Sequence, residues 1–324
     1  MYKILMTREL PYKNFDLFGD DFKFFINKGK QLTRDQLLKK VQGMDGIIST
    51  LRNNIDTEVI KSAGSNLKVI SNYAVGYDNI DVKEASKNQI FVTNTPGVLT
   101  ETTADHAWAL LMSASRRVVE SHNYILDDKW KDWHPLFFAG HDIHGKTLGI
   151  IGLGRIGTAI ARKSLGFNMN LIYYSRTRKP VLEEELNIKY RSLKEVLEQS
   201  DFVMLSVPLT PKTEHLIGKD ELGLMKDSAY IINISRGPVV DEKALITALK
   251  NGEIAGAGLD VFKNEPINPD NPLLKLSNVV LTPHIGSSTI ETRKLMAKVT
   301  LENVYYVLKA DYEKAYIVNK KGLI

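Results

Sequence analysis

The stretch "TLGIIGLGRIGTAIAR" (Thr147–Arg162) decides the fold. An apolar run leads into Gly152, Gly154 and Gly157, spaced as G-x-G-x-x-G, and a helical pattern follows. A strand, a glycine turn and a helix in this order are typical of the unit that binds a dinucleotide. The first glycine permits a tight turn, the second lets the backbone approach a pyrophosphate, and the third lets helix and strand pack closely. The N–H groups at the helix start then face the phosphates.

The next apolar run, "NLIYYS", ends in Ser175, Arg176, Thr177, Arg178 and Lys179. At this strand tip an Asp or Glu bonds the ribose hydroxyl of NAD, whereas an Arg accommodates the 2′-phosphate of NADP. A carboxylate would repel a phosphate dianion that a guanidinium can bind with two hydrogen bonds. The tip therefore predicts NADP as the preferred cofactor, with NAD possible if the cations form only a solvated loop.

Strand-like runs alternate with helical patterns on both sides of this unit. One series precedes it, with the runs "YKILMT", "FKFFIN", "GIIST", "KVISNY" and "FVTNT". A second series contains "TLGIIG", "NLIYYS", "FVMLSV", "AYIINIS", "GAGLDV" and "VVLTP". Alternation of this kind predicts parallel sheets with helices on both faces. We expect an α/β protein with two doubly wound parallel-sheet domains, a Rossmann cofactor domain and a flavodoxin-like substrate domain, with an active-site cleft between them.

Two long helical patterns set the domain boundaries. Thr103–Ile125 predicts one helix that leads into the second series, and 290–309 predicts a late amphipathic helix that returns to the first domain. The substrate-binding domain is therefore expected to be discontinuous, with residues 1–98 and 288–324. The dinucleotide-binding domain takes residues 99–287.

Composition excludes several classes of protein. The 43 basic and 38 acidic residues give a formal charge of +5, but they are interleaved, so a nucleic-acid partner is not expected. The absence of cysteine excludes disulfides and thiolate chemistry. No run approaches the about 20 apolar residues of a membrane helix, and the start lacks a signal peptide. We expect a cytoplasmic protein without a membrane partner.

Three polar residues follow strand-like runs of the second series. Arg236 lies in "NISRGPVVDE", Glu265 in "GLDVFKNEP" and His284 in "LTPHIGSS". Ligands of parallel sheets bind at the carboxyl ends of strands, so these side chains can converge. Reduction of a 2-oxoacid by hydride needs a cation to polarise the carbonyl, a proton donor, and a carboxylate that raises the donor's pKa. The sequence predicts Arg236, His284 and Glu265 in those roles.

The chain resembles the D-isomer-specific 2-hydroxyacid dehydrogenase family, most of all its glyoxylate/hydroxypyruvate reductase branch. The resemblance rests on "GKTLGIIGLGRIGTAIA", "VPLTPKTEHLIG", "INISRGPVVDEKALITALKNGEIAGAGLDVF" and "LTPHIGSST". It implies the catalytic set Arg236, Glu265 and His284, and a contact of Asp260 with the nicotinamide amide. It also implies a cofactor site made of Thr103, Gly152, Gly154, Arg155, Ile156, Gly157, Ser175, Arg176, Thr177, Arg178, Val207, Pro208, Thr213, Ile234, Asp260 and Gly286.

The segment "NYAVGYDNID" resembles the family's substrate loop, in which the N–H groups of Val75 and Gly76 hold the substrate carboxylate. Leu51 is expected to line the pocket, and Arg236 and His284 to contact the substrate. Asp105 stands where many relatives have Glu, which leaves the role of that acid open.

The segment "KWKDWHPLFFAGHDIHGKTLGI" resembles the part that embraces a neighbouring subunit. A homodimer is therefore expected, with Trp133 either reaching the partner's substrate site or only anchoring the interface. His141 and His144 lie three residues apart, but no carboxylate cluster accompanies them, so no metal is expected.

Several activities stay open. Formate dehydrogenases have a Gln–His pair, so Glu265 counts against them. Phosphite dehydrogenase fits the tryptophan segment less well, and phosphoglycerate dehydrogenase usually has an acid where this chain has Ser175. Reduction of a larger sugar acid such as 2-ketogluconate is the alternative within the enzymes. Outside the enzymes, the fold also serves dinucleotide-sensing co-repressors, which we expect to carry docking segments that are missing here. The sequence favours NAD(P)H-dependent reduction of a small 2-oxoacid.

Overall fold

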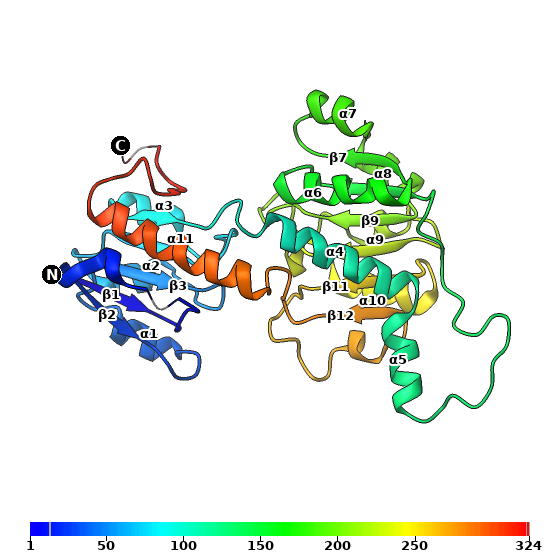
Figure 1. The fold of residues 1–324 in the computed structure, drawn as a ribbon, viewed down its shortest axis with the longest axis horizontal. Helices are drawn as coiled ribbons and strands as arrows, with labels where there is room; N and C mark the ends of the chain where they lie inside the picture. Colours follow the sequence, from blue (N-terminus) through cyan, green and yellow to red (C-terminus); the bar gives the residue numbers. More distant parts are fainter. Residues whose placement is uncertain (13, 322, 324) are drawn as a thin grey trace. The chain divides into compact units, whose positions relative to one another are not determined.

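The chain forms two compact units in the computed structural model, which describes residues 1–12, 14–321 and 323 (Figure 1). The first unit comprises Met1–Leu99 and Ser288–Ile324, and the second comprises Thr100–Ser287. The sequence placed these two junctions at 98/99 and 287/288. Residues 13, 322 and 324, which fall within the range expected for the first domain, lie outside the described residues.

The first unit contains a parallel sheet in the order β2-β1-β3-β4-β5, the flavodoxin-like order. Its strands are β1 (Tyr2–Met6), β2 (Phe22–Ile26), β3 (Gly46–Ser49), β4 (Val69–Asn72) and β5 (Phe91–Thr93). Its helices are η1 (Asp16–Asp21), α1 (Arg34–Lys40), α2 (Thr57–Ala63), α3 (Val82–Lys87) and α11 (Ile290–Leu308). As expected, the C-terminal helix α11 packs on this sheet, against β3, β4 and β5, and is drawn in orange beside the blue strands in Figure 1.

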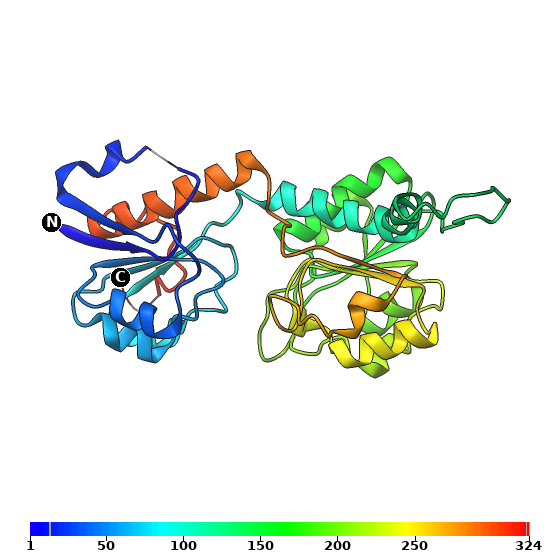
Figure 2. The same cartoon turned by 90° about the horizontal axis from the view of Figure 1, so that it is seen from below.

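The second unit contains a seven-stranded parallel sheet in the order β12-β11-β10-β9-β6-β7-β8. Six of these strands reproduce the Rossmann order, and β12 extends its edge. The strands are β6 (Thr147–Ile151), β7 (Asn170–Tyr174), β8 (Lys189–Tyr190), β9 (Phe202–Leu205), β10 (Tyr230–Asn233), β11 (Gly256–Leu259) and β12 (Val279–Leu281). Helices cover both faces of the sheet (Figure 2). The predicted fold class, two doubly wound parallel sheets, is therefore confirmed.

The helices of the second unit are α4 (Thr100–Ser115), α5 (Val118–Leu126), α6 (Arg155–Ser164), α7 (Pro180–Leu186), α8 (Leu193–Gln199), α9 (Lys219–Leu222) and α10 (Glu242–Asn251). Short 3-10 turns lie at η2 (Leu165–Phe167), η3 (Gly237–Val239) and η4 (Pro272–Lys275). Four elements were not predicted from the sequence, because they are short and have weak apolar periodicity: α3, α7, α9 and β8.

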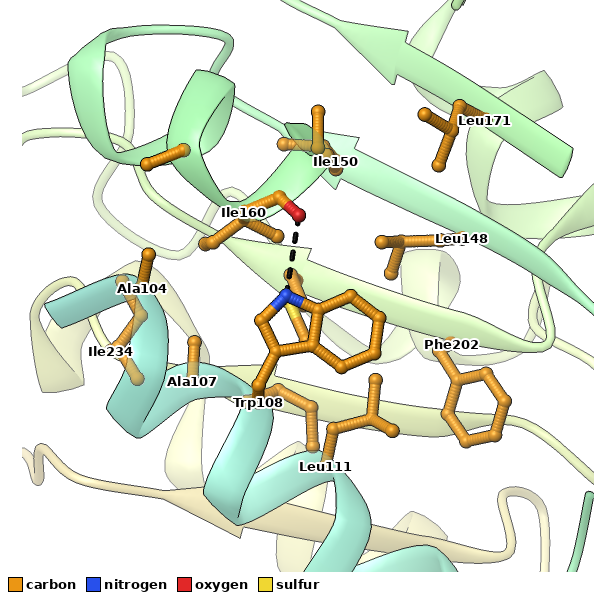
Figure 3. Packing of buried hydrophobic residues seen from close by; sticks show 14 of the residues in the cluster. Ala104, Ala107, Trp108, Leu111, Leu148, Ile150, Ile160, Leu171, Phe202 and Ile234 are labelled. Atoms are coloured by element: carbon orange, nitrogen blue, oxygen red, sulfur yellow. Dashed lines mark hydrogen bonds between the residues drawn. The ribbon is translucent and has the colours of Figure 1, made fainter. Parts of the chain in front are cut away.

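Helices α4 and α6 share one apolar core above the sheet. Trp108 of α4 is buried, and its indole N–H donates to the carbonyl of Ile160 in α6 at 3.2 Å, as Figure 3 shows. Leu148 and Ile150 of β6 and Phe202 of β9 belong to the same cluster. This packing fixes the helix that follows the glycine turn.

The prediction of one helix over Thr103–Ile125 is wrong, because α4 ends at Ser115 and α5 starts at Val118. The carbonyl of Ser115 accepts a hydrogen bond from the N–H of His141 at 2.9 Å, so it is engaged outside the helix. A Cβ on Gly140 would lie 2.2 Å from that carbonyl oxygen, so the returning chain packs directly on the helix end. Arg117 then takes a left-handed conformation with φ 53°, which breaks the helical path.

No helix among the described residues combines the length and the apolar character that crossing a bilayer requires.

Candidate functional site

The glycine turn after β6 has the geometry that its sequence predicts. Gly152 has φ +100°, and a Cβ there would lie 2.8 Å from Cγ1 of Val207. A Cβ on Gly157 would lie 2.2 Å from the carbonyl oxygen of Gly152, so only glycine lets α6 approach the turn so closely. Gly154 caps α6 and has open space beside it, with no side chain on the cap. The turn and helix start therefore fit the pyrophosphate of a dinucleotide.

The residues expected to bind the cofactor lie along one edge of the second sheet. They follow six strands at their carboxyl ends: 152–157 after β6, 175–178 after β7, 207–213 after β9, Ile234 after β10, Asp260 after β11 and Gly286 after β12. Thr103 comes from α4, and its side chain would be 3.4 Å from a Cβ on Gly286. The hydroxyl of Thr213 donates to the carbonyl of Pro208 at 2.6 Å and shapes the loop after β9.

The tip of β7 is exposed from Arg176 onwards. The hydroxyl of Ser175 donates to the carbonyl of Thr177 at 2.6 Å, which tightens the turn that carries the cations. Arg178 is paired with Glu183 of α7 at 2.7 Å. Arg176 forms no ion pair or side-chain hydrogen bond with any residue that the structure describes.

The register of three neighbouring strands brings the predicted catalytic residues to one edge. Asn233 of β10 pairs with Leu259 of β11, which pairs with Leu281 of β12. Arg236 and His284 each lie three residues beyond the paired positions of β10 and β12. Glu265 lies in the loop after β11, between these two strands.

His284 and Glu265 are in contact. Nδ1 of His284 lies 2.7 Å from Oε2 of Glu265, and Oε1 of Glu265 accepts a hydrogen bond from the N–H of Phe262 at 3.1 Å. A Cβ on Gly237 would lie only 1.9 Å from the carbonyl carbon of Phe262, so the loops after β10 and β11 touch at this glycine. The close approach brings the backbone next to Arg236 against the loop that carries Glu265.

A buried carboxylate holds the turn that carries His284. Asp260 is 1% exposed, and its carboxylate accepts hydrogen bonds from the N–H groups of Ile285 and Gly286, both at 2.8 Å. Its carbonyl accepts from the N–H of His284 at 2.9 Å. His284 has φ +54°, a conformation that costs a non-glycine residue about 1 kcal/mol. The three hydrogen bonds stabilise this strained turn.

Two partners of Asp260 were not predicted from the sequence. The hydroxyl of Thr282 donates to Oδ1 of Asp260 at 2.7 Å, and Nε2 of His106 on α4 lies 3.2 Å from the same oxygen. Burial by itself raises the pKa of Asp260, but the hydrogen bonds from His106, Thr282 and Ile285 together hold it below its usual value. His106 lies three residues after Thr103, and that helical spacing was a signal that both face the site.

In the first unit, the loop after β4 presents two backbone donors. The carbonyl of Val75 accepts from the side-chain amide of Asn94 at 2.8 Å, and the carbonyl of Gly76 accepts from that of Asn72 at 2.8 Å. Because a peptide is trans, the N–H of Gly76 points away from the bound carbonyl of Val75. The N–H groups of Val75 and Gly76 donate to no group within the described residues.

Asparagines form the support of this loop. Nδ2 of Asn72 also lies 2.9 Å from Oδ1 of Asn79, whose own amide donates to the carbonyl of Asn53 at 2.9 Å. Asn303 of α11 donates to the carbonyl of Asn94 at 2.9 Å. Leu51 is half-buried in the turn after β3. The loop was predicted from the sequence, but its support by asparagine side chains was not.

Asp105 and the two loop histidines have other contacts in the structure. Asp105 forms an ion pair with Lys163 of α6 at 2.9 Å, so it links α4 to α6. His141 packs edge-on against Tyr230, and Nε2 of His144 lies 3.3 Å from the amide of Asn168. No group of three or more potential metal ligands was found in the part of the chain that the structure describes.

The Rossmann order, the glycine turn and the His–Glu pair at the carboxyl edge define a dinucleotide-dependent oxidoreductase. Residues 108–286 match the model of the D-isomer specific 2-hydroxyacid dehydrogenase, NAD binding domain. The chain belongs to this family, as the sequence predicted, and it uses a nicotinamide dinucleotide.

Relatives resemble the chain over almost its whole length. It is 51% identical to a glyoxylate reductase of Korarchaeum cryptofilum, covering 93% of this chain and 91% of that protein. It is 48% identical to a glyoxylate reductase of Pyrococcus furiosus, covering 98% and 96%. Among solved structures, an NADPH-dependent glyoxylate/hydroxypyruvate reductase from Sinorhizobium meliloti, in complex with NADP and malonate, is 33% identical with a TM-score of 0.79, covering 94% and 93%.

Proposed function

We propose that this protein reduces a small 2-oxoacid of the glyoxylate or hydroxypyruvate type to the D-2-hydroxyacid, with NADPH preferred over NADH. The observation that carries the proposal is the contact between His284 and Glu265 at 2.7 Å, in the same sheet edge as Arg236. The similarity to glyoxylate reductases supports the choice of substrate.

Each catalytic side chain has one task in this reaction. Protonated His284 donates from Nδ1 to Glu265, which leaves Nε2 as the nitrogen that delivers a proton to the carbonyl oxygen. Arg236 polarises that carbonyl and orients the carboxylate, since a guanidinium binds carboxylates with two hydrogen bonds. The reduced nicotinamide, when bound, supplies the hydride.

The N–H groups of Val75 and Gly76 hold the substrate carboxylate. Two consecutive amides without a protein acceptor form a favourable site for an anion. Leu51, half-buried beyond β3, lines the same site and limits the size of the group on the 2-oxoacid. This limit favours a two-carbon or three-carbon acid over a sugar acid.

The cofactor lies along the carboxyl edge of the second sheet. Its pyrophosphate faces the turn Gly152–Gly157, and its 2′-phosphate lies at the tip of β7, near Arg176 and Arg178. Oδ2 of Asp260 accepts only one hydrogen bond, from Gly286, among the described residues, so it retains capacity to accept from the nicotinamide amide.

A substrate panel tests the proposal. Purified protein is supplied with NADPH and with glyoxylate, hydroxypyruvate or 2-ketogluconate, and the configuration of each product is determined. We expect turnover of the first two and D-glycerate from hydroxypyruvate. Faster turnover of 2-ketogluconate would contradict the substrate assignment, and binding of NADPH without turnover of any oxoacid would favour the sensing function.

The protein is proposed to act as a homodimer. Trp130 and Trp133 in the loop after α5 are 56% and 67% exposed, and Leu136 is 77% exposed. Burying these side chains against a second copy would remove apolar surface from water. Light scattering of the wild type and of Trp133→Ser tests this, with a dimer expected for the first and a monomer excess for the second. A monomeric wild type would contradict the proposal.

The cytoplasmic location remains a prediction.

A further inference from the structure

Glu183 holds one of the cations at the tip of β7. Its Oε1 accepts from Nε of Arg178 at 2.9 Å, and its Oε2 accepts from Nη2 at 2.7 Å. The two contacts occupy the Nε and Nη2 edge of the guanidinium, which is one of the two edges that can bind a phosphate with two hydrogen bonds. Together the pair has no net charge.

The carboxylate of Glu183 is fixed from its other side. The hydroxyl of Tyr173 donates to Oε1 at 2.8 Å and accepts from the N–H of Lys179 at 2.7 Å. Burial raises the pKa of Tyr173 to about 12, so the hydroxyl keeps its proton at neutral pH. The ion pair with Arg178 holds the pKa of Glu183 below its usual value, so the carboxylate is charged.

Arg176 differs from Arg178 in this respect. Both side chains are exposed, but Arg176 contacts no carboxylate among the described residues. Its charge is therefore available to an incoming anion, whereas the charge of Arg178 is compensated by Glu183. Glu184, the next residue on α7, is exposed and has no ion pair within the described part of the chain.

We propose that Glu183 limits the selectivity for a 2′-phosphate by neutralising Arg178, so that Arg176 is the cation that binds this phosphate. The inference deepens the proposed function, because it rests on the tip of β7 being the NADPH selector. It separates two arginines to which the sequence gives equal roles, and it makes Glu183 a specificity-determining residue.

Binding of two small ligands tests the proposal without turnover. The affinities of 2′,5′-ADP and 5′-AMP are measured by calorimetry, because these ligands differ only in the 2′-phosphate. We expect Glu183→Gln to bind 2′,5′-ADP about threefold more tightly, with the affinity for 5′-AMP unchanged, as releasing an exposed ion pair allows. Gln keeps an oxygen that can accept from Tyr173, so the loop is preserved.

Two further variants isolate the cause. Glu184→Gln removes the same charge one residue along and is expected to change the affinity for 2′,5′-ADP less than Glu183→Gln. Arg178→Ala leaves the charge of Glu183 uncompensated and is expected to weaken the binding of 2′,5′-ADP. The double variant with Glu183→Gln is expected to lose the gain and to bind this ligand about as tightly as the wild type. A double variant that keeps the full gain of Glu183→Gln, or a Glu184→Gln gain equal to that of Glu183→Gln, would overturn the proposal.

The outcomes separate this inference from the proposed function. A wild type that binds 2′,5′-ADP no more tightly than 5′-AMP contradicts the NADPH preference, yet a selective gain in Glu183→Gln still supports the role of Glu183. An unchanged or weaker affinity of Glu183→Gln for 2′,5′-ADP overturns the inference. A loss shared by both ligands also overturns it, because Glu183 would then only support the loop.

Discussion

Two loops of this chain present hydrogen-bond donors that could bind an anion. One loop uses backbone N–H groups, and the other uses charged side chains. The loop after β4 uses the neutral N–H groups of Val75 and Gly76, whose orientation is set by asparagine side chains. The tip of β7 uses exposed cations on a short turn, one of them paired with Glu183. The first loop offers neutral groups that are held in place, and the second offers exposed charged groups.

The difference between neutral and charged donors suits the two loops to different functions. Buried or half-buried dipoles are screened little by salt and are suited to fixing a small acid for chemistry. Exposed charges attract an anion over a longer range but contribute modestly, because water and salt screen them. We therefore expect changes near the buried groups to affect substrate turnover, and changes at the tip of β7 to affect the choice of cofactor.

The largest effect is expected from replacing His284, the proposed proton donor, which lies in neither loop. His284→Ala should lower kcat by about 10²- to 10⁴-fold, the usual contribution of a positioned general acid. Affinity for 2′,5′-ADP should stay unchanged, because the turn after β6 and the tip of β7 remain intact. Rates come from NADPH oxidation and affinities from calorimetry. Wild-type turnover in the variant would exclude His284 as the acid.

The second prediction concerns the fixed loop. Asn94→Ala removes the side chain that donates to the carbonyl of Val75, while its backbone bonds to Tyr316 and Asn303 remain. The KM for glyoxylate should rise about tenfold, as loss of one hydrogen bond to a half-buried carbonyl allows. The KM for NADPH should not change. Asn88→Ala, on the exposed end of α3, is the control, and an equal effect there would show that the support of the loop is irrelevant.

The third prediction concerns the charged tip. Arg176→Ala should raise the KM for NADPH about fivefold, within the range of exposed ion pairs, and leave the KM for NADH unchanged. Lys189→Ala, which removes an exposed cation from neighbouring β8, serves as the control. Equal losses with both cofactors would mean that Arg176 does not distinguish them.

A higher salt concentration should weaken binding at the charged tip of β7 selectively. Raising NaCl from about 0.05 M to about 0.5 M shortens the Debye length from about 14 Å to about 4 Å. The KM for NADPH should then rise by more than the KM for NADH, because only the former requires the cations at the tip of β7. Parallel changes for both cofactors would argue against a phosphate at these cations.

The smallest expected effect is on the free energy of unfolding. It comes from Asp201, whose charge has no proposed part in ligand binding. Asp201 accepts from the N–H of Thr147 and from Nζ of Lys226, both at 2.8 Å. Burial raises the pKa of Asp201, but these hydrogen bonds outweigh it and leave the pKa below the ordinary 3.8. The carboxylate therefore stabilises the fold fully above about pH 4 and loses this effect as the pH falls through the lowered value.

Asp201→Asn should accordingly cost about 1 kcal/mol of unfolding free energy at pH 7. The difference from the wild type should shrink at pH 2.5, and denaturant titrations at the two pH values measure it. A difference that stays constant with pH would show that the charge of Asp201 does not contribute.

The features that the sequence predicted are those with a local signal. The glycine turn is one, because Gly152 and Gly157 mark it by their spacing, and the structure requires glycine at both positions. The parallel strands are another, because continuous apolar runs between helical patterns identify them. The contact of Glu265 with His284 was expected from the carboxyl ends of neighbouring strands.

The features that the sequence did not predict depend on distant contacts. The break after Ser115 arises because residue 141 returns to its carbonyl, which no pattern within the helix reveals. Asn94 resembles an ordinary turn residue, yet its position is fixed by Asn303, 209 residues later. Glu183 lies in a run of three glutamates, and only the structure distinguishes the one that contacts Arg178.

The most direct test of the central claim compares kcat/KM for glyoxylate with NADPH and with NADH in the wild-type protein. We predict turnover with both cofactors and a value about tenfold higher with NADPH, in line with a charge-assisted phosphate contact. Equal or higher values with NADH would contradict the role of the cations at the tip of β7. An absence of turnover for glyoxylate and hydroxypyruvate with either cofactor would contradict the proposed reaction.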